Sequence, residues 1–168
     1  MPRSPRPAPA VHLDVLNHTR GRLPGRKLLR KAAQMALARA AGCGPLATTL
    51  VCVGQREMTK LNARFYRCRR PTDVLSFPHG EPDRETGRWL AGEVVICRDV
   101  AVREARARGL SVAGELLLYA VHGWLHLAGY DDHDPRRARR MHERAREILA
   151  GRSARAVPAR LWAGLLEA

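Results

Sequence analysis

Residues 113–129 read AGELLLYAVHGWLHLAG, an apolar run interrupted by one glutamate and two histidines. Its length and composition predict a helix inside the fold, and Gly129 is a typical left-handed residue to end it. The run is apolar enough to suggest a membrane span. However, Glu115, His122 and His126 interrupt it, so a buried helix is the better prediction. We therefore expect the fold to be built around this helix.

His122 and His126 are four residues apart, so on a helix their rings project from one face, about one turn apart. Two imidazoles at this spacing can share one metal ion, as in the HExxH zinc enzymes. A turn at Gly129 can bring a third ligand back from residues 131–133, so the layout is similar to that of the metzincin proteases. Gly123 stands where those proteases have the glutamate that acts as general base. The pattern thus predicts a metal site but argues against peptide hydrolysis.

Strands cluster in the first hundred residues, and three helices follow them. The expected strands are residues 11–17, 47–54, 72–78 and 92–99, and the expected helices are 23–42, 57–66, 99–108, 112–127 and 135–150. Residues 79–88 are polar and rich in turn formers, which predicts an exposed loop. This order predicts an α+β fold, in which a small mixed four-stranded sheet is covered by about five or six helices and the metal site lies on a central helix.

The length of 168 residues is most simply one domain. We expect a disordered, proline-containing arm at residues 1–10, a single catalytic domain at 11–150 and a tail at 151–168 that either packs back or frays.

The chain is strongly basic, with 30 lysines and arginines against 16 aspartates and glutamates and a formal net charge of +14. Only Lys27, Lys31 and Lys60 are lysines, so the excess is nearly all arginine. The arginine fork suits phosphate geometry, which favours a nucleic-acid partner. The alternative is arginine usage that reflects a biased genome.

The cysteines indicate a reducing compartment, because they form no CxxC pair and no framework of the secreted type. They are Cys43, Cys52, Cys68 and Cys97. Cys52 and Cys97 fall in apolar runs and are expected to be small core residues. The first ten residues, MPRSPRPAPA, have no apolar segment of the signal-peptide kind. We therefore expect a cytoplasmic protein with no membrane partner.

Several motifs together resemble one family. HGWLHLAGYDDH (122–133) resembles the HGxLHLxGYDH signature of the YbeY family of endoribonucleases. PTDVLSFP (71–78) matches the second signature of that family, GEVVIC (92–97) matches its following strand, and the Leu-Asn pair at 61–62 has the expected spacing. The resemblance covers roughly residues 11–150 in the right order, which makes it specific.

The resemblance implies an α+β hydrolase with one metal ion, usually Zn²⁺. It also implies a role in ribosomal RNA processing, notably at the 3′ end of the small-subunit RNA, and in ribosome quality control. The implied partners are ribosomal RNA, the small ribosomal subunit and ribosome-associated proteins.

Two residues depart from the family pattern. The third histidine of the family aligns with Asp132, while His133 lies one residue further on. Aligned position favours Asp132 and ligand preference favours His133, and a site with two histidines and an aspartate is chemically sound. We predict Asp132 as the third ligand, with His133 as the alternative or as a residue that supports the site. The arginine of the family aligns with Tyr66, and Arg67 beside it is the candidate replacement.

The sequence does not name the catalytic base clearly. Asp131 is a candidate, either as the base or as a carboxylate that orients a ligand histidine. It is equally well explained as a turn residue after Gly129. A third alternative is that the 2′-hydroxyl of the RNA acts as nucleophile, and the protein then only stabilises charge.

Further candidates precede or belong to the strand at 72–78. In the family that the chain resembles, this strand borders the metal cleft, which implies catalytic roles for Asp73 and Ser76. The alternatives are a turn before the strand for Asp73 and an outward polar residue for Ser76. Arg67, Arg69 and Arg70 form a basic cluster that predicts contacts with RNA phosphates, and Arg67 is also a catalytic candidate. A solvated run of charges is the usual alternative.

The leading hypothesis is a metal-dependent endoribonuclease that acts on ribosomal RNA. The rival is a ribosome-associated assembly factor that binds RNA, holds a structural metal and cleaves little. Aromatic residues are sparse, so we expect recognition through backbone charge and RNA shape rather than base stacking. The helix at 135–150 is either an RNA contact or a cover that buries Met141, Ala145 and Ile148, or both. His142 on that helix is expected to be solvated.

Overall fold

The computed structural model describes residues 10–40 and 45–150. In chain order its elements are β1 (Val11–Asn17), α1 (Arg26–Ala36), the 3₁₀ turn η1 (Leu37–Arg39), β2 (Leu46–Val53), α2 (Gln55–Tyr66), β3 (Val74–Pro82), β4 (Trp89–Cys97), α3 (Arg98–Arg108), α4 (Val112–Leu127) and α5 (Pro135–Ala150). The predicted tail, nine of the ten residues of the predicted arm, Gly42 and Cys43 lie outside the described residues.

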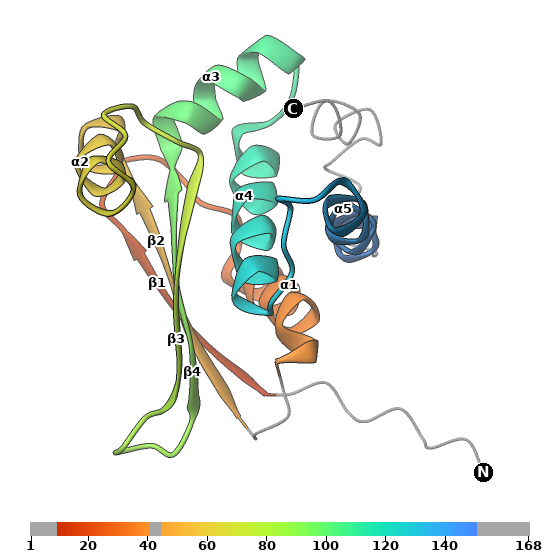
Figure 1. Ribbon diagram of the computed structural model, residues 1–168. Coiled ribbons are helices and arrows are strands. Elements are labelled where there is room, and N and C mark those ends of the chain that lie inside the picture. The colour runs from red at the N-terminus through yellow and green to blue at the C-terminus, as the bar shows by residue number, and fades with distance from the viewer. Residues whose placement is uncertain (1–9, 41–44, 151–168) are drawn as a thin grey trace.

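The strands form one mixed sheet in the order β1-β2-β4-β3. β1, β2 and β4 run parallel, and β3 pairs with β4 antiparallel. Figure 1 shows α1, α4 and α5 on one side of this sheet and α2 on the other. The predicted α+β fold with a mixed four-stranded sheet and a central helix is therefore confirmed.

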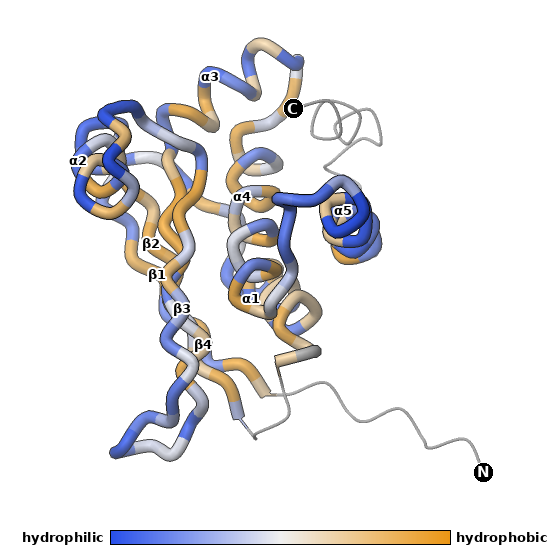
Figure 2. The backbone as a smooth tube through the Cα atoms, viewed as in Figure 1, coloured by the Kyte–Doolittle hydropathy of each residue, from blue (hydrophilic) through white to orange (hydrophobic). Residues whose placement is uncertain are grey.

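The apolar run in the middle of α4 forms the centre of the molecule. The helix packs against β3 and β4 on one side and is flanked by α1, α3 and α5. Leu116, Val121, Trp124 and Leu125 are fully buried, which explains the unbroken hydrophobicity of the stretch. Figure 2 shows this apolar centre, and it shows hydrophilic residues over the hairpin between β3 and β4. No helix in the described ranges is long and apolar enough to cross a membrane.

β3 is longer than predicted. The predicted strand ends at Pro78 and the predicted loop begins at residue 79, but β3 continues to Pro82. This is possible because β3 lies at an edge of the sheet, where a missing backbone N–H is tolerated. The register shifts between Pro78 and Glu81, so the strand passes Gly80 with an irregularity. The loop of this hairpin is therefore only residues 83–88.

The remaining elements agree with the sequence to within a few residues. The predicted helix at 23–42 is shorter, since α1 begins after Gly25 and passes into η1 at Leu37. Cys52 and Cys97 are fully buried, as predicted, and burial raises the pKa of the Cys52 thiol to about 11. On α5, the residues expected to cover the core are buried: Met141, Ala145 and Ile148.

Candidate metal centre

Both ends of α4 are defined by specific backbone contacts. Ser111 caps the first turn, since its Oγ accepts a hydrogen bond from a backbone N–H of that turn at 3.0 Å. At the other end Gly129 has a φ of 85°, and the N–H of Tyr130 donates to the carbonyl of Leu125 at 3.0 Å. This left-handed ending reverses the chain, as the sequence predicted. It returns residues 131–133 to the side of the helix.

The two histidine rings of α4 converge. Nε2 of His122 lies 3.0 Å from Nε2 of His126, and the rings are nearly perpendicular at 79°. The other ring nitrogen of His126, Nδ1, lies 3.1 Å from the carbonyl oxygen of Tyr130, to which its N–H donates. This bond places the proton on Nδ1, so the Nε2 atom of His126, on the side that faces His122, keeps its lone pair for a metal.

Asp132 is the residue that the turn brings to the two rings. Its Oδ2 lies 3.5 Å from Nε2 of His122 and 3.7 Å from Nε2 of His126. The side chain of His133 is 88% exposed, and its Nδ1 contacts the carboxylate of Asp131. Of the two alternatives for the third ligand, the geometry thus favours Asp132.

The three atoms fit one small divalent ion. Zinc binds nitrogen and oxygen at about 2.0–2.2 Å in a tetrahedron, so neighbouring ligand atoms are about 3.3–3.6 Å apart. The three pairs formed by the two Nε2 atoms and Oδ2 of Asp132 are separated by 3.0, 3.5 and 3.7 Å. A group of two imidazoles and one carboxylate can therefore hold a metal here and leave one position of the tetrahedron open.

The surroundings keep His122 neutral. Burial of the ring lowers its pKa to about 4, and the neighbouring ring of His126 acts in the same direction. The carboxylates of Asp73 and Asp132 oppose this shift. An imidazole must be neutral to donate a lone pair to a metal, so His122 is available as a ligand throughout the neutral pH range.

These ligands lie in a pocket of about 360 Å³ between α4 and β3. Asp73 and Ser76 from the predicted strand line it, and so does Tyr66 from the end of α2. One carboxylate oxygen of Asp73 accepts hydrogen bonds from the N–H of Val74 at 2.8 Å and from the hydroxyl of Thr72 at 2.9 Å. These bonds fix the Asp73 side chain beside the three candidate ligands.

The side chain of Ser76 forms a hydrogen bond between β3 and α4. Its Oγ donates to the carbonyl of Gly123 at 3.2 Å. A Cβ on Gly123 would overlap Cγ1 of Val94 and would lie 3.1 Å from Oγ of Ser76. The residue that replaces the general base of the HExxH enzymes is therefore a glycine because α4 lies directly on the sheet at this point.

Asp131 lies outside the residues that line this pocket. Its carboxylate accepts hydrogen bonds from the backbone N–H of His133 at 3.0 Å and from Arg137 at 3.1 Å. These partners, together with the His133 ring, hold the pKa of Asp131 well below its ordinary value. The contact between the Asp131 carboxylate and the His133 ring raises the pKa of His133. This environment suits a residue that shapes the turn better than one that accepts a proton.

Comparison with known proteins supplies the family. The family model described as "Endoribonuclease YbeY" matches residues 22–152. The chain belongs to the YbeY family.

Individual members are similar over most of the chain. The endoribonuclease YbeY of Anaeromyxobacter sp. is 40% identical over 131 residues, which are 78% of this chain and 66% of that protein. That of Thermobifida fusca is 41% identical over 113 residues, 64% of this chain and 73% of that protein. The solution structure of TM1509 from Thermotoga maritima matches with a TM-score of 0.55 and 26% identity, and covers 88% of this chain and 97% of that one.

The predicted basic cluster of this YbeY member lies in the turn between α2 and β3. Arg67 has a left-handed backbone with a φ of 55°, and its side chain is exposed. Arg67, Arg69 and Arg70 are not among the residues that line the metal pocket, whereas Tyr66 is. The expectation that Arg67 fills the place of the family arginine is therefore not supported by the geometry.

Two residues near the centre were missed or misjudged from the sequence. Asn62 is buried, and its side-chain amide donates to the carbonyl of Arg70 at 2.8 Å, which ties the basic turn to α2. The Leu-Asn motif contains this residue, but spacing alone assigns it no role. His142 is partly buried rather than solvated, and burial lowers its pKa while Asp132 opposes the shift. The available signal was its position three residues before Ala145, which puts the two on one face of the helix.

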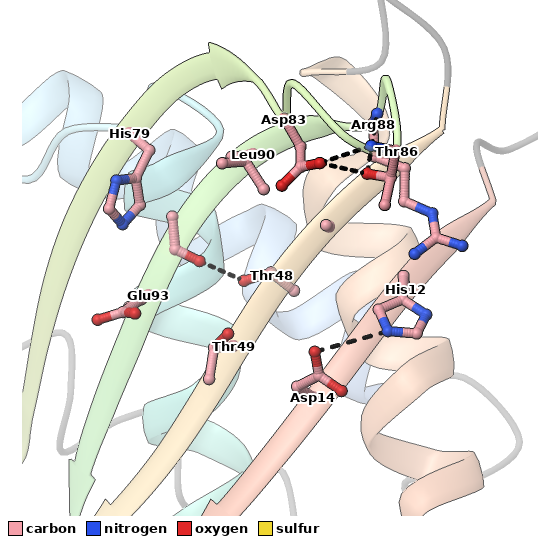
Figure 3. A pocket seen from close by; sticks show the side chains of 12 residues that line it. His12, Asp14, Thr48, Thr49, His79, Asp83, Thr86, Arg88, Leu90 and Glu93 are labelled. Atoms are coloured by element: carbon pink, nitrogen blue, oxygen red, sulfur yellow. Dashed lines mark hydrogen bonds and ion pairs between the residues drawn. The ribbon is translucent and has the colours of Figure 1, made fainter.

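A second pocket of about 360 Å³ lies on the other face of the sheet (Figure 3). His12 and Asp14 of β1 pair there at 3.5 Å, and the hydroxyl of Thr48 donates to the carbonyl of Gly92 at 2.9 Å. The Oδ1 of Asp83 accepts three hydrogen bonds within its own hairpin. None of the predicted site residues lines this pocket, so the candidate site is the one beside α4.

Proposed function

We propose that this protein is an endoribonuclease that requires one divalent metal ion, most simply Zn²⁺, and acts in the maturation of ribosomal RNA. The observation that carries the proposal is the convergence of His122, His126 and Asp132 in an open pocket of a YbeY-family chain. We further propose the family role at the 3′ end of the small-subunit RNA and in ribosome quality control. The partners are then the small subunit and ribosome-associated proteins, and the compartment is the cytoplasm.

We propose a different role for each group of residues in and near the pocket. The two rings and Asp132 would hold the ion, and when bound it would supply Lewis acidity for charge on a phosphodiester oxygen and would lower the pKa of water. Asp73 lies in the same pocket, and we propose it, in preference to Asp131, as the group that accepts a proton from the nucleophile. The exposed guanidinium groups of Arg69 and Arg70 contact phosphates of the bound strand.

A structural metal in an RNA-binding assembly factor is less well supported. That alternative needs a closed set of four ligands, which the chain would complete by using both Asp132 and His133. The side chain of His133 is 88% exposed, and His133 does not belong to the group formed by His122, His126 and Asp132. Three ligand atoms and one open position favour catalysis.

The test is cleavage of a small-subunit RNA fragment by the purified protein, with and without a chelator. We expect the wild type to cleave the RNA. The chelator should abolish cleavage and added Zn²⁺ should restore it, and the His126→Ala variant should not cleave. Zinc content measured on the same two preparations should fall from about one ion per chain to near zero in the variant. Cleavage that persists in His126→Ala would mean that another nuclease is present and that this chain is not the enzyme.

A further inference from the structure

We infer that Tyr66 is a stacking platform for one base of the RNA, next to the phosphodiester bond that is cut. This inference rests on the proposed ribonuclease function and adds a specificity-determining residue to it. Aromatic residues are sparse in the chain, yet the structure puts one of them at the metal pocket.

Tyr66 lines the same pocket as the candidate metal ligands. Among the described residues that line it, Tyr66 alone is a tyrosine, phenylalanine or tryptophan, and it lies there with Asp73, His122, His126 and Asp132. Its exposed fraction is 56%, so much of its surface is open to a ligand. A nucleotide whose phosphate reaches the metal ligands would therefore bring its base within reach of this ring.

The adjacent aromatic residue, Phe65, has a different environment from that of Tyr66. Phe65 is also about half exposed, but its ring packs against Phe77 with centroids 4.8 Å apart. Phe77 follows Ser76 in β3, and since successive side chains of a strand alternate, it points to the face of the sheet away from α4. Phe65 thus covers the outer face of the sheet, whereas Tyr66 faces the pocket.

The backbone at Tyr66 is held in place. Tyr66 is the last residue of α2, and Arg67 ends the helix in the left-handed region. The carbonyl of Asn62 accepts a hydrogen bond from the N–H of Cys68 at 3.3 Å, and its side chain holds Arg70. A ring on a fixed backbone loses little freedom when a base stacks on it, which is the property of an effective platform.

Stacking on an aromatic ring tolerates any base but requires that the base is free of its neighbours. Bases inside an A-form duplex are already stacked, and side chains cannot enter its deep, narrow groove. A platform at Tyr66 therefore selects an unpaired nucleotide at the cut site. Arg69 and Arg70 in the next turn would contact the backbone of the same strand.

The experiment compares four metal-loaded, full-length proteins: wild type, Tyr66→Phe, Tyr66→Ala and Phe65→Ala. The substrate is a single-stranded RNA that contains 2-aminopurine beside the bond that wild type cuts, and stacking on the ring quenches its fluorescence. We expect Tyr66→Phe to stay within about two-fold of wild type in KM, because the face of the ring is kept. Tyr66→Ala should raise KM by roughly 10-fold or more, as loss of one base stack does, and should lose the quenching.

Phe65→Ala is the matched control, and its KM and quenching should equal those of wild type. Melting temperatures of all four proteins, with Tyr66→Leu as a further variant that keeps apolar bulk without a ring, separate lost stacking from lost folding. Unchanged KM in Tyr66→Ala, or an equal defect in Tyr66→Phe that would assign the effect to the hydroxyl, overturns the inference. If wild type itself cleaves no RNA, the proposed function fails instead.

Discussion

Asp132 brings a negative charge to a position where the alternative residue, His133, would bring a neutral ring. Two neutral imidazoles and one carboxylate leave a bound divalent ion with a single net positive charge. Aspartate also suits a wider range of divalent metals than a third imidazole does. The identity of this one side chain thus affects both the affinity and the selectivity of the centre.

We predict that Asp132→Asn loses metal and that His133→Ala keeps it. Loss of a group that only orients a ligand already weakens binding by about 10–100-fold, so loss of the ligand itself should weaken it by at least about 100-fold. Zinc affinity measured by competition with a chromophoric chelator tests both variants side by side. A normal affinity in Asp132→Asn together with a large loss in His133→Ala would reverse the assignment.

Glu115 is the other residue whose environment has a measurable consequence. It is fully buried on α4, and its carboxylate lies 3.7 Å from the guanidinium of Arg108. Burial raises its pKa above the ordinary value of 4.5, and Arg108 opposes the shift. The folded protein therefore binds this proton more tightly than the unfolded chain does.

The raised pKa predicts the direction of a pH effect. Stabilisation by the bound proton is complete below pH 4.5 and is lost as the pH rises through the higher pKa of the folded state. The glutamine of Glu115→Gln has no proton to lose. As the pH rises from 4 to 7.5, the free energy of unfolding of this variant should therefore increase relative to that of wild type. Urea unfolding of both proteins with a chelator present measures this difference, and a constant difference across the range would contradict the prediction.

At the scale of elements, the close contact of α4 with the sheet decides where the ligands lie. Gly123 lets the helix approach β3 and β4, and the hydroxyl of Ser76 fixes the contact. The sequence shows the helix and its histidine spacing because both are local. It does not show that Gly123 and Ser76 meet, since they are 47 residues apart and belong to different elements.

Gly123→Ala tests whether the fold needs this close contact between α4 and the sheet. The added methyl group overlaps Val94, and such overpacking costs about 1–3 kcal/mol of unfolding free energy. Gly25→Ala is the matched control, because a Cβ there meets no atom within 4 Å. Urea denaturation compares the two variants. Equal stabilities would mean that α4 does not need the close approach.

The edge strand shows where sequence patterns are insufficient. Pro78 and Pro82 indicate the end of a strand unless the strand lies at an edge, and position in the sheet is decided by pairing with β4. The basic turn is a similar case. Its arginines are evident in the sequence, but their position relative to the pocket depends on the bonds that Asn62 makes to the turn. Non-local contacts decide both features.

At the scale of the whole molecule, the charge of +14 predicts a polyanionic partner only as a general preference. Charge alone does not show where a nucleic acid would run. The family, by contrast, could be predicted from motifs in order along the chain, and so could the α+β class. What the motifs do not supply is the position of the basic turn relative to the pocket, and hence the path along which we propose that RNA runs.

Salt dependence of binding tests that path. We predict that Arg69→Gln with Arg70→Gln lowers the slope of log K against log salt for single-stranded RNA by about 1.4, since each phosphate contact contributes about 0.7. Arg106→Gln, a change of an exposed arginine on α3, serves as control and should leave the slope unchanged if the RNA does not reach that helix. An unchanged slope in the double variant would place the RNA elsewhere.

The three ligand candidates come from eleven consecutive positions late in the chain, from His122 to Asp132, although Asp73 of the same pocket precedes them by almost fifty residues. During translation the sheet is therefore synthesised first and the metal-binding segment afterwards. A nascent chain that has not yet emerged beyond Asp132 has no complete centre.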